Sequence, residues 1–150
     1  MPSAIDARLI DLEGLLIRRY AASAALLDVD TFERWGAAHA SPDQIAEMTA
    51  RAQRAEAEHR ETSAALRERV RALRQAAPEL VAAWADAHAQ LLTELIAASG
   101  DDPAASTTRF VADEERRAWG EVRAGTRDFV EENCFYVHID PARRLELLGV

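Results

Sequence analysis

The chain has 150 residues, about the size of one domain, and its formal net charge is −8. An acidic chain without a basic tail, and without a basic patch interleaved with aromatic side chains, is not expected to bind nucleic acid. Its apolar runs are only a few residues long, so we expect no segment that spans a membrane.

The first predicted element is an amphipathic helix that Ser3 caps and that ends near residues 28–30. The next segment, 31–40, contains Gly36 and is expected to form only a short helical turn. The helix is predicted because one stripe of residues recurs at three- and four-residue spacing. The stripe consists of Ile5, Leu9, Leu12, Leu16, Tyr20, Ser23 and Leu27.

A second and longer helix is predicted to follow. Ser41 is placed to cap it, Pro42 occupies the first helical position, and Gln44 completes a capping box. Its seam is weak in the middle, where small or polar residues replace leucine, so we expect a closely packed partner helix there. The seam residues are Ile45, Met48, Ala52, Ala55, His59, Thr62, Leu66, Arg69 or Val70, and Leu73.

Pro78 interrupts this second helix, and it either kinks the helix or starts a new one. Helical spacing of apolar residues then continues to about residue 96. Gly100 and an Asp-Asp-Pro turn mark a loop over residues 98–107. A last long helix is expected over residues 111–129.

The loop at Gly100 makes the helices on its two sides antiparallel. Equal distances along the chain from this loop place Trp84 opposite Trp119 and His88 near Glu115. For His88 and Glu115 we expect a buried hydrogen bond or ion pair rather than catalysis.

The chain ends in a tail of different character, residues 133–150. An alternating run there is expected to be extended, with one apolar face, and a short helix is expected to start at Pro141. Cys134, the only cysteine, is expected to pack as a small apolar side chain. Deletion of the tail should lower stability or change the oligomeric state. The residues expected to contact the bundle or a second chain are Phe135, Val137, Ile139, Leu145 and Leu148.

These elements predict an all-α fold, an up-down bundle of about four helices built as two long hairpins. One domain is expected over residues 1–150, with a helical body at 1–132 and the tail at 133–150. All 18 basic residues are arginine, which is typical of a GC-rich genome of the bacterial type. A single cysteine and the acidic N-terminal residues, where a signal peptide would be basic, place the protein in the cytoplasm.

A candidate metal site lies in the run RAEAEHRE, where Glu56 and His59 form an E-x-x-H pair on one helix face. Folding back at the first turn places Glu13 roughly opposite His59, and the three residues together resemble part of the ferritin-like di-iron pattern. This resemblance implies iron or manganese, in a metal-binding protein or an oxidase. Because one chain lacks the second half of the pattern, a dimer would have to complete the site. The alternative is no cofactor, with His59 hydrogen-bonded to Glu13 in the core.

Four arginines at intervals of seven, four and three residues share the outer face of the second helix. The simplest interpretation of such a stripe is a solvated surface. The alternative is a docking strip for an acidic partner or for another subunit. The arginine stripe consists of Arg60, Arg67, Arg71 and Arg74.

Long amphipathic helices, a weak seam and the arginine stripe favour a non-enzymatic interaction or assembly protein, an adaptor or a chaperone. We expect it to form a homo-oligomer, a dimer first of all, and to hold a protein client. The runs LIDLEGLLIRRYAASAALL and MTARAQRAEAEHRETSAALRERVRAL are similar to flagellar and type III export chaperones. This resemblance implies a helical hairpin that guards a segment of its client. Enzymatic activity stays an open question, because the sequence contains no complete catalytic motif.

Overall fold

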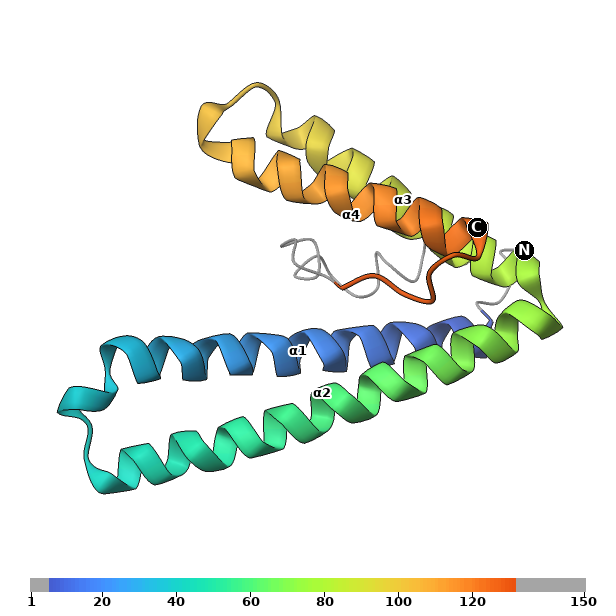
Figure 1. Ribbon diagram of the computed structural model, residues 1–150. Helices are drawn as coiled ribbons and strands as arrows, with labels where there is room; N and C mark the ends of the chain where they lie inside the picture. Colours follow the sequence, from blue (N-terminus) through green and yellow to red (C-terminus); the bar gives the residue numbers. More distant parts are fainter. Residues whose placement is uncertain (1–5, 132–150) are drawn as a thin grey trace.

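The computed structural model describes residues 6–131, and every regular element in that part of the chain is helical (Figure 1). The predicted all-α class is therefore confirmed. None of the helices in the described range is long and apolar enough to cross a lipid bilayer. The elements are α1 (Ala7–Trp35), α2 (Pro42–Ala76), α3 (Pro78–Ser99) and α4 (Ser106–Ala124), with short 3-10 helices η1 (Ala37–His39) and η2 (Pro103–Ala105) in the connections.

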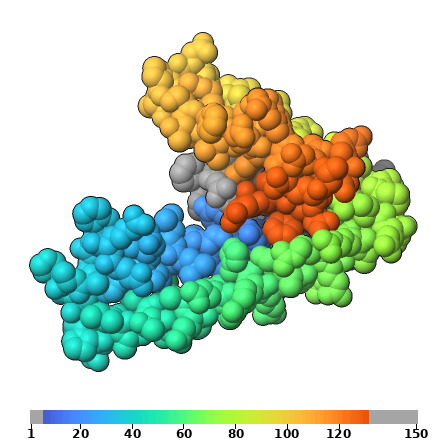
Figure 2. All heavy atoms as spheres, in the orientation of Figure 1, coloured from blue at the N-terminus to red at the C-terminus, as the bar shows by residue number. Residues whose placement is uncertain are grey.

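The four helices form two antiparallel hairpins (Figure 1). The first hairpin consists of α1 and α2, and the second consists of α3 and α4. They meet at the end where Ala77 links α2 to α3, which we call the shared end, and their other ends diverge (Figures 1 and 2). The fold is thus the two-hairpin form of the predicted bundle.

Side-chain hydrogen bonds cap the N-termini of α1 and α2. Asp6 accepts a hydrogen bond from the backbone N–H of Arg8 at 2.9 Å and caps α1. At the start of α2, the Gln44 N–H donates to the Ser41 hydroxyl at 3.2 Å, and the Ser41 N–H donates to the Gln44 side chain at 2.8 Å. The capping box predicted at Ser41 is confirmed.

The end of α1 differs from the prediction. The helix does not stop near residues 28–30 but continues to Trp35. Arg34 pairs with Asp30 one turn earlier, at 3.1 Å, which supports this last part of the helix. Gly36 is the first residue that interrupts the helix, so the turn to α2 is shorter than expected and begins later.

Pro78 sets the boundary between α2 and α3, and Gly125 sets the end of α4. Ala77 has φ −152° and ψ 71°, and Pro78 is the first residue of α3, so the long middle helix is broken at this point rather than kinked. At the other end, Gly125 has φ +86°, in the left-handed region that glycine adopts most easily. As a result α4 ends at Ala124, short of the predicted end at residue 129.

The hydrophobic core lies at the shared end, and all four helices contribute side chains to it. It contains leucines from the first half of α1 and the last part of α2, and it closes around Trp84 and Trp119. Both tryptophans are fully buried. The larger core side chains are Leu9, Leu12, Leu15, Leu16, Leu66, Val70, Leu73, Val81, Trp84, Leu91, Leu92, Trp119, Val122 and Val130.

The outer half of the first hairpin, away from the shared end, has a much thinner seam. Its buried apolar side chains are small: Ala22, Val29 and Ala55. Exposed ion pairs also link its two helices, Arg18 with Glu58 at 2.6 Å and Arg51 with Asp28 at 3.0 Å. Because exposed ion pairs contribute little, this half is held together more weakly than the core.

Candidate functional site

A buried carboxylate connects the two hairpins. Glu13 of α1 is 3% exposed, and its Oε1 atom accepts a hydrogen bond from Trp84 Nε1 of α3 at 2.8 Å. The same oxygen hydrogen-bonds to Nε2 of His88, one turn further along α3. Two groups of α3 therefore bind one oxygen of α1.

Aromatic contacts hold the imidazole of His88 in place. Its ring stacks on Trp119 with a centroid distance of 4.1 Å and an interplanar angle of 7°. Trp84 meets Trp119 edge to face, with centroids 4.9 Å apart, which confirms the predicted closeness of these two tryptophans. We call Glu13, Trp84, His88 and Trp119 the junction cluster. Stacking and edge contacts of this kind add specific geometry to the burial of the rings.

Glu115 of α4 was expected near His88. It is buried, at 4% exposure, and lies one turn before Trp119, the residue on which His88 stacks. A direct bond between His88 and Glu115 stays a prediction. A hydrogen bond of His88 reaches across the hairpins to Glu13. This partner was missed because the fold-back at Gly100 relates only α3 to α4 and says nothing about α1.

His59 does not lie opposite Glu13. Arg18 pairs with Glu58 at 2.6 Å, and this register places His59 close to the level of Tyr20 on α1. His59 and Glu13 are therefore separated by about two helical turns, or about 10 Å along the axis. The error follows from the helix end described above, because a longer α1 moves the turn and shifts every pairing across the hairpin.

The three residues of the candidate metal site are not brought together within one chain. Glu13 belongs to the junction cluster, Glu56 is exposed, and His59 is half-buried. Among residues 6–131, no three histidine, cysteine, aspartate or glutamate side chains are close enough to hold a metal ion. A site shared between two chains stays a prediction.

Two arginines of the stripe, Arg71 and Arg74, bind the segment that follows α4. Arg71 Nε binds Asp128 at 2.9 Å, and Arg74 binds the same carboxylate at 3.1 Å. Arg74 also donates to the carbonyl oxygens of Val122, at 3.2 Å, and Arg127, at 2.9 Å. These two arginines therefore hold the chain that follows α4, rather than only facing solvent.

The other two members of the stripe have no such role in the described part of the chain. Arg60 and Arg67 are exposed, and neither forms an ion pair or a side-chain hydrogen bond with another residue in the range 6–131. Exposed guanidinium groups keep five N–H donors for other contacts. Arg60 and Arg67 are therefore consistent both with a solvated surface and with a docking strip for a partner.

Arg19 is a further anchor, which the sequence analysis missed. It is only 8% exposed, and its guanidinium donates to the Ser63 hydroxyl at 2.9 Å and to Glu131 at 3.4 Å. It also lies over the ring of Phe129, 5.1 Å from the centroid, next to the buried Val130. The sequence feature that could have indicated a buried Arg19 is its position one turn after Leu16, a core leucine of α1. Figure 2 shows the segment after α4 against the first hairpin.

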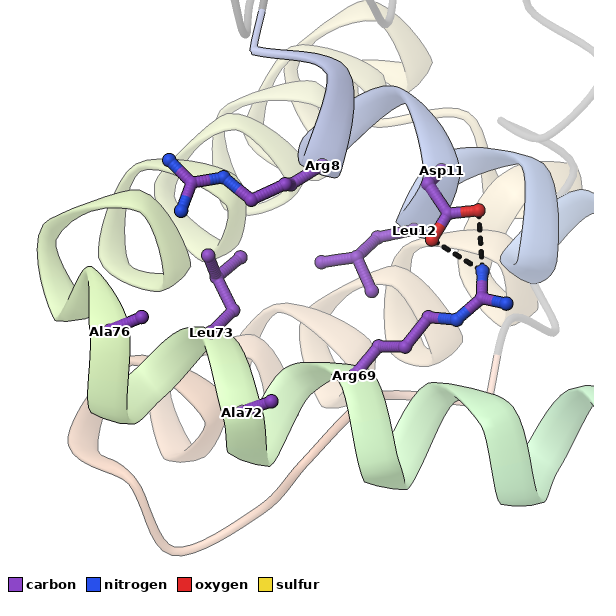
Figure 3. A pocket seen from close by; sticks show the side chains of 7 residues that line it. All are labelled: Arg8, Asp11, Leu12, Arg69, Ala72, Leu73 and Ala76. Carbon is purple, nitrogen blue, oxygen red and sulfur yellow. Dashed lines mark hydrogen bonds and ion pairs between the residues drawn. The ribbon is translucent and has the colours of Figure 1, made fainter.

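A pocket of about 290 Å³ lies between the start of α1 and the end of α2 (Figure 3). Its walls are apolar, and its charged rim is already paired, Arg69 with Asp11 and Arg8 with Asp6. Hydrogen bonds from Arg8 lower the pKa of Asp6 to about 2. The pocket is lined by Arg8, Asp11, Leu12, Arg69, Ala72, Leu73 and Ala76.

The predicted contact residues of the tail lie outside the described range. They are Phe135, Val137, Ile139, Leu145 and Leu148, together with the cysteine at position 134. Their role in contacts with the bundle or with a second chain stays a prediction.

Comparison of the chain with known protein families, with curated proteins and with solved structures found no match. The function therefore has to be inferred from the geometry of this chain. That geometry combines a buried polar junction with large apolar side chains that are exposed on the helices. The exposed side chains are Ile10, Leu27, Trp35, Ile45 and Phe110.

Proposed function

We propose that the protein is a non-enzymatic helical interaction protein that assembles with itself through the outer half of the first hairpin. The observation that carries this proposal is the exposure of large apolar side chains on helices whose own seam is thin. Trp35, at the end of α1, is 81% exposed, and Leu27 is 66% exposed. Exposed tryptophan and leucine side chains close to one another in the chain are typical of surfaces that bind another protein.

The energetics of the seam support the same proposal. Complete burial of a leucine side chain contributes about 2 kcal/mol, whereas alanine offers much less apolar area. The outer half buries Ala22, Val29 and Ala55, in contrast to the leucines of the shared end. Two helices joined by such a seam gain stability when a third or fourth helix covers them. A partner on this half would therefore stabilise the hairpin as well as bind to it.

A second copy of the chain is the partner in this proposal. Two first hairpins packed around a twofold axis would form a four-helix, coiled-coil-like arrangement that covers both thin seams. The resulting homodimer would act in the cytoplasm as an adaptor or a chaperone-like protein, with its second hairpins available to a client.

Thermal unfolding of the full-length chain at several protein concentrations tests the proposal. A self-associating protein unfolds at a higher temperature as its concentration rises, because association stabilises only the folded state. We expect this dependence in the wild type and its loss in the double variant Leu27→Ser, Trp35→Ser. Gln53→Ser, at an exposed polar position of α2, is the matched control and should keep the dependence. A melting temperature independent of concentration in the wild type would contradict the proposal.

A further inference from the structure

A groove of about 430 Å³ crosses the outer half of the first hairpin, between α1 and α2. The second hairpin diverges from this half, so neither α3 nor α4 covers the groove (Figure 1). Because alanine side chains fill little volume, the groove has room for the side chains of a partner. The alanines that line it are Ala21, Ala22, Ala25 and Ala55.

Three arginines line the same groove, and two of them are paired within the chain. Arg18 binds Glu58 at 2.6 Å, and Arg51 binds Asp28 at 3.0 Å. The third, Arg54, is exposed and forms no ion pair or side-chain hydrogen bond in the described part of the chain. The groove therefore offers one guanidinium group, with all of its N–H donors, to a partner.

An unpaired acidic side chain lies nearer the start of the same helix. Glu47 is exposed and has no ion pair among the described residues, because Arg51, one turn later, binds Asp28 instead. Arg54 follows Glu47 by one heptad, a spacing that returns to the same helix face. Since seven residues span about 10 Å along the axis, the two charges do not pair within one chain. This face of α2 thus presents one unpaired positive charge and one unpaired negative charge.

We propose that a second copy of the chain packs antiparallel on this face, with Arg54 of each copy bound to Glu47 of the other. A twofold axis between residues 50 and 51 of α2 generates both contacts, because an isologous interface repeats every pair. A parallel arrangement would instead place Arg54 level with Arg54 and Glu47 level with Glu47, so that like charges repel each other. The inference rests on the proposed self-association and adds the orientation and register of the two chains.

The exposed tryptophan of α1 supports the same register. The ion pair between Asp28 and Arg51 places these two residues at one level, so the twofold axis passes close to Asp28 on α1. Rotation about this axis brings Trp35, one heptad after Asp28, to the level of Ala21 of the second copy, one heptad before it. Trp35 is 81% exposed, and Ala21 lines the groove. A large apolar side chain of each copy would therefore meet the hollow that the alanines of the other leave.

Sedimentation velocity of full-length charge variants at several concentrations tests the pairing through the dissociation constant of the dimer. We expect Arg54→Glu and Glu47→Arg each to weaken the dimer about tenfold, because two ion pairs per dimer become repulsive contacts. The double variant Arg54→Glu, Glu47→Arg restores opposite charges and should dissociate within about threefold of the wild-type constant. An equimolar mixture of the two single variants should recover the same affinity, since each mixed dimer contains two pairs of opposite charge. Recovery on mixing can arise only between chains.

Arg67→Glu is the matched control, because Arg67 is an exposed arginine on a different face of α2 and should leave the constant unchanged. Circular dichroism would verify that each variant keeps its helical content. If the wild type dimerises and Arg54→Glu associates as tightly as Arg67→Glu, this inference is overturned and the proposed function stands. A mixture of the single variants that stays as weak as either one alone would overturn it too. A wild type that remains monomeric would contradict the proposed function and the inference together.

Discussion

Glu13 and His88 lie 75 residues apart in the sequence and meet in a buried hydrogen bond between the first and the second hairpin. Trp84 donates to the same carboxylate oxygen at 2.8 Å. Glu13 is 3% exposed and His88 is 1% exposed, so water does not compete for this contact. Loss of Glu13 would take from the buried Trp84 Nε1–H the acceptor that it has here. The contact therefore helps to set how the two hairpins pack at their shared end.

Substitution of the junction carboxylate should be costly. We expect Glu13→Ala to lower the free energy of unfolding by about 3 kcal/mol, because Trp84 Nε1 loses its acceptor and His88 Nε2 loses a hydrogen-bond partner in the core. Glu13→Gln keeps an acceptor oxygen and should cost less. Urea denaturation of the full-length chain, followed by tryptophan fluorescence, measures both. Glu56→Ala, at an exposed position, should change stability by less than about 0.5 kcal/mol. A similarly small change in Glu13→Ala would contradict this role of the junction cluster.

Removal of the Arg74 side chain should loosen the segment that follows α4. Arg74 binds Asp128 and two backbone carbonyl oxygens, so we expect Arg74→Ala to open this segment about tenfold more often, or by about 1.4 kcal/mol. Amide hydrogen exchange over residues 126–131 measures that opening. Arg67→Ala, on the same stripe but without an ion pair in the described range, is the control. If both variants exchange equally fast, Arg74 does not anchor the segment.

We expect the stability that the Asp6 carboxylate contributes at the start of α1 to depend on pH. Its pKa is lowered from 3.8 to about 2 by hydrogen bonds from Arg8. A lowered carboxyl pKa means that the folded state holds the ionised form, so the stabilisation is complete above about pH 4 and is lost as pH falls through about 2. We expect Asp6→Ala to be less stable than the wild type at pH 7, with the difference shrinking at pH 2. Denaturation curves at the two pH values measure this, and an equal difference at both would refute it.

The metal alternative can be decided by elemental analysis of protein purified without chelator. Since one chain does not bring Glu13, Glu56 and His59 together, we expect iron and manganese well below one atom per two chains. We also expect no difference between the wild type and Glu56→Ala. Iron or manganese near one atom per chain or per pair of chains, lost in Glu56→Ala, would instead favour a site completed across a dimer.

Local patterns predicted most of the helical architecture. The capping box at Ser41, the interruption at Pro78 and the contact of Trp84 with Trp119 all follow from interactions between near neighbours or across one short loop. Such interactions depend on few residues, so composition and spacing are sufficient to predict them. The weak seam of α2 was likewise evident from its alanines.

The arrangement of the site depended on features that local patterns do not contain. The end of α1 lies later than its apolar spacing suggested, and this shift moved His59 about two turns away from Glu13. The bond between Glu13 and His88 depends on how one hairpin packs on the other, and no loop length specifies that packing. Arg19 was missed for a related reason, since its partner Glu131 follows a helix end that the left-handed Gly125 sets.

Self-association of the full-length chain is the central claim, and sedimentation equilibrium measures it most directly. We expect a mass that rises with concentration to twice the monomer mass of 16.5 kDa, and that stays at the monomer mass in the Leu27→Ser, Trp35→Ser variant. A wild-type mass that remains at 16.5 kDa up to high micromolar concentrations would contradict the claim.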